Sequence, residues 1–115
     1  MEKVLNLAEK LGEAIAMSDR FKALRTTEEN VAKDEAATKA QEDLEKQLTK
    51  IGELEGSGKP VEVADKRELD RLQEKIRSYP SLQALVKAQA DYFEMMNKVN
   101  ETIVNRLRPP EKKSD

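Results

Sequence analysis

The sequence contains no cysteine, no histidine and no tryptophan, and it has only four glycines, four prolines and 3% aromatic residues among 115 positions. Without cysteine and histidine the chain lacks thiolate nucleophiles, imidazole general bases, disulfides and the usual ligands of zinc and iron–sulfur centres. It also lacks an apolar run of 18 residues, the length typical of a membrane-spanning helix. We therefore expect a cytoplasmic protein that is not an enzyme, needs no cofactor or metal and does not bind membranes.

Charged residues make up 38% of the chain and hydrophobic residues 37%, a composition typical of long helices and coiled coils. The formal net charge is only −2, so no strong overall field attracts nucleic acid or an anionic membrane. The halves differ: residues 1–56 carry 9 basic and 13 acidic side chains, and residues 57–115 carry 12 and 10. This opposite balance favours antiparallel pairing of the two halves.

Apolar residues recur at helical spacing along nearly the whole chain. Ser18 and Asp19 can cap a second helix, and Asp34 resembles the N-cap of a third, although the spacing leaves open whether the chain bends at Asp34. The segment Gly56-Ser57-Gly58-Lys59-Pro60 predicts a turn, because two glycines and a proline destabilise a helix. The predicted helices cover residues 2–17, 19–33, 35–55, 62–78 and 80–107.

These segments predict an all-α protein, an elongated bundle of about five long antiparallel helices. Residues 1–108 form one helical domain in this interpretation, and residues 109–115 form a flexible polar tail. The last helix carries a heptad-like apolar repeat with several adjacent pairs. This repeat consists of Leu82, Leu85/Val86, Gln89, Tyr92/Phe93, Met96, Val99/Asn100, Ile103 and Leu107.

The length of the last helix predicts association. A helix of roughly 28 residues is about 42 Å long, whereas a compact chain of this size has a diameter of about 35 Å. Part of the apolar repeat is therefore expected to be covered by a second copy, in a homodimer or higher oligomer, or by another protein. The predicted protein interface consists of Tyr92, Phe93, Met96, Val99, Ile103 and Leu107.

Few other patterns point to chemistry. The carboxylate pairs Glu28/Glu29, Glu42/Glu45 and Asp70/Glu74 lie among positive neighbours and indicate solvated helix faces rather than catalytic pairs. Arg67, Arg71 and Lys75 form a basic stripe at steps of four that could contact phosphates. Acidic residues interrupt that stripe and no aromatic residue accompanies it, so direct nucleic-acid binding is only the alternative hypothesis.

Several segments together resemble the bacterial YlbF/YmcA/YheA family. In the first half they are Ser18-Asp19-Arg20-Phe21-Lys22-Ala23-Leu24 and Val31-Ala32-Lys33-Asp34-Glu35-Ala36-Ala37. In the second half they are Ile76-Arg77-Ser78-Tyr79-Pro80-Ser81-Leu82, Ala88-Gln89-Ala90-Asp91-Tyr92-Phe93 and Val99-Asn100-Glu101-Thr102-Ile103. Their order and spacing carry the likeness over about residues 3–104.

The resemblance implies an all-α cytoplasmic regulator that forms oligomers and has no known catalytic residues. Some members influence RNA processing through a complex with partner proteins, and those members carry cysteines that bind an iron–sulfur cluster. This chain has no cysteine, so the cluster is not carried over. The sequence thus predicts a helical adaptor that acts by protein–protein interaction, and the resemblance implies a link to RNA processing through partner proteins. The alternatives are a small RNA-associated protein and a purely structural homo-oligomer.

Overall fold

The computed structural model describes residues 1–109, which fold into five helices with no strand among them. The all-α prediction is confirmed, and the helix bounds agree with the predicted ones to within a residue. The predicted tail from 109 onwards lies outside the described residues except for Pro109. The helices are α1 (Glu2–Ala16), α2 (Asp19–Lys33), α3 (Glu35–Gly56), α4 (Val63–Arg77) and α5 (Pro80–Leu107).

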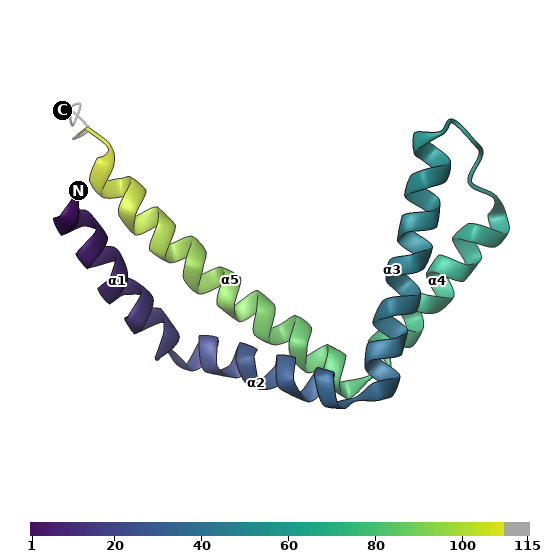
Figure 1. The fold of residues 1–115 in the computed structure, drawn as a ribbon, viewed down its shortest axis with the longest axis horizontal. Helices are drawn as coiled ribbons and strands as arrows, with labels where there is room; N and C mark the ends of the chain where they lie inside the picture. Colours follow the sequence, from purple (N-terminus) through teal and green to yellow (C-terminus); the bar gives the residue numbers. More distant parts are fainter. Residues whose placement is uncertain (110–115) are drawn as a thin grey trace, which may run out of the picture.

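The helices form an open V with two arms (Figure 1). The first arm consists of α1, α2 and α5, and α2 packs antiparallel along α5. The second arm is the antiparallel hairpin of α3 and α4. The radius of gyration is 20.7 Å, whereas a compact domain of this length has about 13 Å. The predicted elongation is thus present in a single chain.

The chain bends at Asp34, the point that sequence spacing left open. Asp34 has φ −96° and ψ 95°, which is incompatible with a continuous helix, and its carboxylate accepts a hydrogen bond from the Ala37 amide at 3.1 Å. Ser81 Oγ, from the first turn of α5, donates to the other carboxylate oxygen at 2.8 Å. The corner between α2 and α3 is therefore fixed by a cap and by a contact with a distant helix.

The turn after α3 is a complete Schellman motif. The amide of Lys59 donates to the carbonyl of Leu54 at 2.9 Å, and the amide of Gly58 donates to the carbonyl of Glu55 at 3.2 Å. Gly58 has φ +72°, a conformation that residues with a Cβ rarely adopt. The predicted turn is confirmed, and it directs α4 back along α3.

The hydrophobic core lies where the two arms meet, a region that we call the elbow. Its buried side chains come from α2, α3 and α5, and they are joined by half-buried residues of α4 and its C-terminal turn. Ala37 is completely inaccessible to solvent, so α3 approaches its neighbours closely at a small side chain. The elbow core consists of Val31, Ala37, Leu82 and Leu85, with Leu24, Ile76 and Tyr79 packed against it.

Candidate functional site

Among the residues that the structure describes, the end of the first arm furthest from the elbow has no buried core. No residue of α1 is buried, and α5 has no buried residue after Ala88. Large apolar side chains are instead exposed on both helices in this region. They are Val4, Leu5, Leu7 and Leu11 on α1 and Phe93, Ile103, Val104 and Leu107 on α5.

The adjacent apolar pairs of α5 divide between two faces. Leu85 is buried and Tyr92 and Val99 are half-buried, whereas Val86, Phe93 and Asn100 are exposed. Consecutive residues point about 100° apart on a helix, so the first member of each pair faces the neighbouring helix and the second faces solvent. The repeat read from the sequence therefore describes two faces, and only one of them is covered.

The covered face opens into a groove towards the end of the arm. The groove has a volume of about 380 Å³ and lies between α1 and the C-terminal half of α5, with Arg20 of α2 at one edge. Sequence analysis did not assign Leu11, Arg20 or Lys98 to a site, although Leu11 belongs to the apolar stripe of α1. The groove is lined by Leu11, Arg20, Met95, Lys98, Val99, Thr102 and Ile103.

Two cations share one carboxylate beside the groove. Glu94 lies 3.1 Å from Lys98 Nζ and 3.6 Å from Arg20 Nη1. The hydrogen bond from Lys98, and then the charges of Lys98 and Arg20, lower the pKa of Glu94 below its ordinary value. Arg20 also donates to the carbonyl of Asp91 at 2.9 Å, which ties α2 to α5. The edge of the groove therefore keeps a positive balance.

An aromatic group lies where the covered and exposed faces of α5 meet. The rings of Phe21 and Tyr92 are 6.0 Å apart, and those of Tyr92 and Phe93 are 6.4 Å apart, both in tilted geometry. The Arg25 guanidinium lies 5.1 Å above the Phe21 ring, within cation–π distance. Tyr92 is thus held between helices, and Phe93 projects into solvent.

The structure places the six predicted interface residues in different surroundings. Tyr92, Met96 and Val99 are half-buried on the side of α5 towards its neighbours, and Phe93, Ile103 and Leu107 are exposed. Val99 and Ile103 line the groove, whereas Phe93 lies outside it. Their role in binding stays a prediction.

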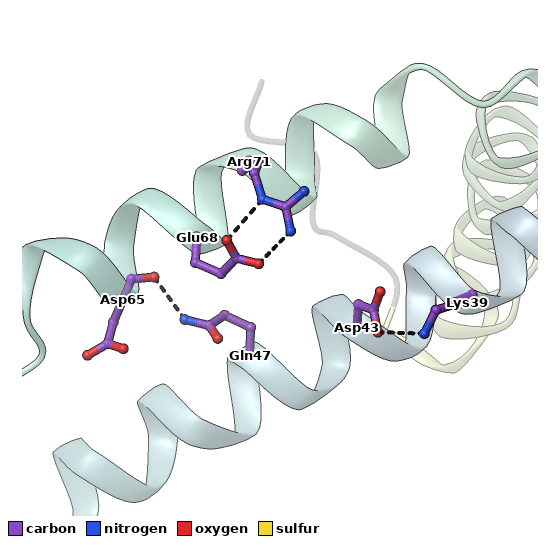
Figure 2. A network of polar contacts seen from close by, with 6 residues as sticks. All are labelled: Lys39, Asp43, Gln47, Asp65, Glu68 and Arg71. Atoms are coloured by element: carbon purple, nitrogen blue, oxygen red, sulfur yellow. Dashed lines mark hydrogen bonds and ion pairs between the residues drawn. The ribbon is translucent and has the colours of Figure 1, made fainter.

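The predicted basic stripe lies on the exposed surface of α4. Arg71 donates two hydrogen bonds to Glu68, at 2.9 and 2.6 Å (Figure 2). The hydrogen bond and charge of Glu68 raise the pKa of Arg71, and those of Arg71 lower the pKa of Glu68. Arg67 and Lys75 are exposed on the same helix. The central cation of the stripe is therefore paired within its own helix, which weakens its ability to hold a phosphate.

The second arm is joined by polar contacts between its two helices. Gln47 of α3 donates to the carbonyl of Asp65 on α4 at 2.9 Å, whereas the pair of Lys39 and Asp43 lies within α3 (Figure 2). Lys50 of α3 lies 2.9 Å from the carboxylate of Asp65. The hydrogen bond from Lys50 lowers the pKa of Asp65, and the pKa of Lys50 is raised in turn. These contacts hold α3 and α4 together.

Two further features bear on the class of site. Within residues 1–109, no three carboxylates come together in a way that could hold a metal ion. No helix in that range is both long enough and apolar enough to cross a bilayer.

Two curated proteins resemble this chain in sequence over most of its length. The chain is 27% identical over 105 residues to a UPF0342 protein of Desulfitobacterium hafniense, a match that covers 91% of this chain and 80% of that protein. It is 22% identical over 102 residues to a UPF0342 protein of Lactobacillus acidophilus, covering 89% and 88% of the two chains. No solved structure matches the chain.

A family model described as "Control of competence regulator ComK, YlbF/YmcA" matches residues 4–108. The match covers α2 to α5 completely and α1 from Val4 onwards, and the resemblance seen in the sequence is confirmed. This chain belongs to the YlbF/YmcA family, which is linked to control of the competence regulator ComK.

Proposed function

We propose that this protein is a non-enzymatic adaptor that regulates a partner in the ComK pathway by binding it at the groove between α1 and α5. The observation that carries the proposal is that no described residue of α1, and none of α5 after Ala88, is buried, although both helices have apolar faces there. Contiguous apolar surface of this kind marks interaction sites on soluble proteins.

The chemistry of the groove favours one kind of partner. Leu11, Val99 and Ile103 supply apolar contacts, and two flanking helices provide a slot of the kind that receives an amphipathic helix. Arg20 and Lys98 add positive charge at the edge, and they share one carboxylate, that of Glu94. The partner segment is therefore an amphipathic helix with acidic residues beside its apolar face.

The experiment compares three purified proteins, the wild type, Ile103→Asp and the control Asn105→Asp. Ile103 lines the groove, whereas Asn105 is exposed on the same helix and does not line it. Proteins retained from an extract of the source organism by the wild type and the control, but not by Ile103→Asp, are identified and purified. Their affinity for Ile103→Asp is expected to fall at least about 10-fold, because a charge enters an apolar contact.

Helix content measured by circular dichroism should be the same for all three proteins, since Ile103 is already half exposed. Equal retention of every protein by Ile103→Asp and wild type would contradict the proposal. Salt-sensitive retention of RNA that is lost when Arg67, Arg71 and Lys75 become Glu would favour the RNA-associated alternative. Self-association with no other protein retained would favour a structural homo-oligomer.

A further inference from the structure

The exposed face of α5 carries a continuous repeat of its own, which we call the outer seam. Its residues follow one another at alternating steps of four and three along the helix, the spacing of a coiled-coil contact. All of them are exposed in the single chain, and the seam extends over about 32 Å of helix. The outer seam consists of Val86, Ala90, Phe93, Asn97, Asn100, Val104 and Leu107.

The outer seam is distinct from the groove. The two surfaces share no residue: the groove takes Met95 and Val99 from the other side of α5, and it takes Ile103 from the edge between the two surfaces. Val86, Phe93, Val104 and Leu107 are 62%, 64%, 45% and 77% exposed, so the four large apolar residues of the seam have little cover within the chain. A partner that covers them can bind while the groove stays open.

The repeat indicates what kind of element covers the seam. A step pattern that averages 3.5 residues remains in contact only with another helix that supercoils around it at the same repeat. Asn97 and Asn100 interrupt the apolar residues at the middle of the seam. Each amide can donate to and accept from an identical amide, so a second copy of the same helix satisfies both groups. A lipid surface would leave them unpaired.

The single chain exposes more surface than a compact protein of its mass, enough to supply an interface with a second copy. The accessible surface is 9490 Å², whereas a compact protein of this mass exposes about 6,300 Å². Even if residues 110–115 contributed about 1,000 Å², the value for a fully extended segment, a surplus of about 2,000 Å² would remain. A stable homodimer commonly buries about 1,000 Å² or more on each partner. The surplus is sufficient for the outer seam and the groove together.

Charges beside the seam select the direction of pairing. Lys87, Glu94, Glu101 and Arg108 recur every seven residues along one of its edges. In an antiparallel pair in which Asn97 faces Asn100, this edge would meet itself, with Lys87 near Arg108 and Glu94 near Glu101, and like charges repel. In a parallel pair in register, the charged edge of one copy faces the other edge of the second copy's seam. That other edge carries the uncharged residues Gln89, Met96 and Ile103.

We propose that two copies of this protein pair through their outer seams, with the two α5 helices parallel and in register. Asn97 and Asn100 then each face the same residue of the second copy, and Phe93 packs against its equivalent. Polar residues at such positions fix register and the number of strands in coiled coils. The proposal does not depend on the groove or on the identity of its partner.

Because the chain has no cysteine, disulfide cross-linking can test this directly. Val104→Cys should form a covalent dimer on oxidation at micromolar concentration, since equivalent residues of a parallel pair lie within disulfide distance. Asn105→Cys, one position along and off the seam, is the matched control and should cross-link far more slowly. A disulfide between Phe93→Cys and Val104→Cys in a mixture would overturn the parallel direction, because those positions lie opposite each other only in an antiparallel pair.

Sedimentation tests whether the pair exists without cross-links. The wild type is expected to sediment as a dimer at micromolar concentration, and Phe93→Glu should raise its dissociation constant by about 100-fold or more, because a charge enters the seam. Asn105→Glu should leave it unchanged. Phe93 is exposed in the single chain, so helix content by circular dichroism should survive the substitution. A wild type that sediments as a monomer, or a Phe93→Glu protein that pairs as tightly as wild type, would overturn the proposal.

Discussion

The two ends of the first arm have similar apolar patterns and very different burial. At the elbow, residues of α2, α3, α4 and α5 meet, and Val31, Leu82 and Leu85 are buried there. At the open end, within residues 1–109, only α1 and α5 lie beside each other, and side chains such as Leu7 and Ile103 stay exposed. The periodicity of a helix thus determines which face is apolar, and the number of neighbouring helices determines whether that face is covered.

The strongest test of this comparison truncates one leucine at each end. Leu82→Ala at the elbow is expected to lower the free energy of unfolding by about 2–5 kcal/mol, because it removes buried methyl groups and leaves a cavity. Leu7→Ala on α1 should change it by less than about 0.5 kcal/mol, since that side chain is exposed. Urea denaturation followed by circular dichroism measures both. Equal losses would show that α1 is as well covered as the elbow.

Overpacking gives the next largest effect. Ala37 is completely buried at the elbow, so Ala37→Leu should cost about 1–3 kcal/mol by forcing α3 away from its neighbours. Ala36 precedes it on the same helix and is exposed, which makes Ala36→Leu the matched control. Thermal unfolding should show a lower midpoint for the first variant alone. A lower midpoint for both would point to a loss of helix propensity or solubility instead.

The pH dependence of stability sharpens the role of Asp34. The hydrogen bonds from the Ala37 amide and Ser81 lower the pKa of this carboxyl in the folded protein. The folded state therefore binds fewer protons than the unfolded state, and this contribution is fully present above about pH 4 and is lost as pH falls through the lower folded pKa. Asp34→Asn keeps a capping side chain and removes the titration, so its urea midpoint should fall less between pH 5 and pH 3. An unchanged pH slope would assign the acid sensitivity to other groups.

The smallest effect compares two polar contacts of the second arm. Asp65 connects α4 to α3 through Lys50, whereas Glu68 pairs with Arg71 on its own helix. Asp65→Asn should lower the urea midpoint slightly, because it weakens a contact between two elements. Glu68→Gln should leave the midpoint unchanged within error, since exposed pairs within a helix contribute little. A larger effect of Glu68→Gln would reverse this assignment.

Local chemistry explains how much of the fold could be predicted. The cap at Ser18 and the turn at Gly58 depend on residues a few positions apart, so sequence reasoning placed both correctly. The bend at Asp34 was left open because an aspartate can cap a new helix or continue an old one. Its carboxylate also binds Ser81, which lies 47 residues further along the chain, and no local pattern reveals that contact.

The candidate site shows the same limit. The sequence predicts one broad apolar repeat that includes pairs such as Leu85/Val86 and Tyr92/Phe93, because spacing alone does not show which helices lie beside α5. The structure separates them into a covered face and the outer seam. Arg20 reaches the groove from another helix, and nothing around it in the sequence marks it as part of a site.

The Schellman turn at Gly58 has a practical consequence for following this protein in solution. It lies at the tip of the second arm, away from the elbow, α1 and the C-terminal half of α5 (Figure 1). Exposed turns of this kind tolerate inserted sequence well. A small fluorescent reporter or epitope placed after Lys59 would therefore label the molecule at a position remote from both the groove and the outer seam.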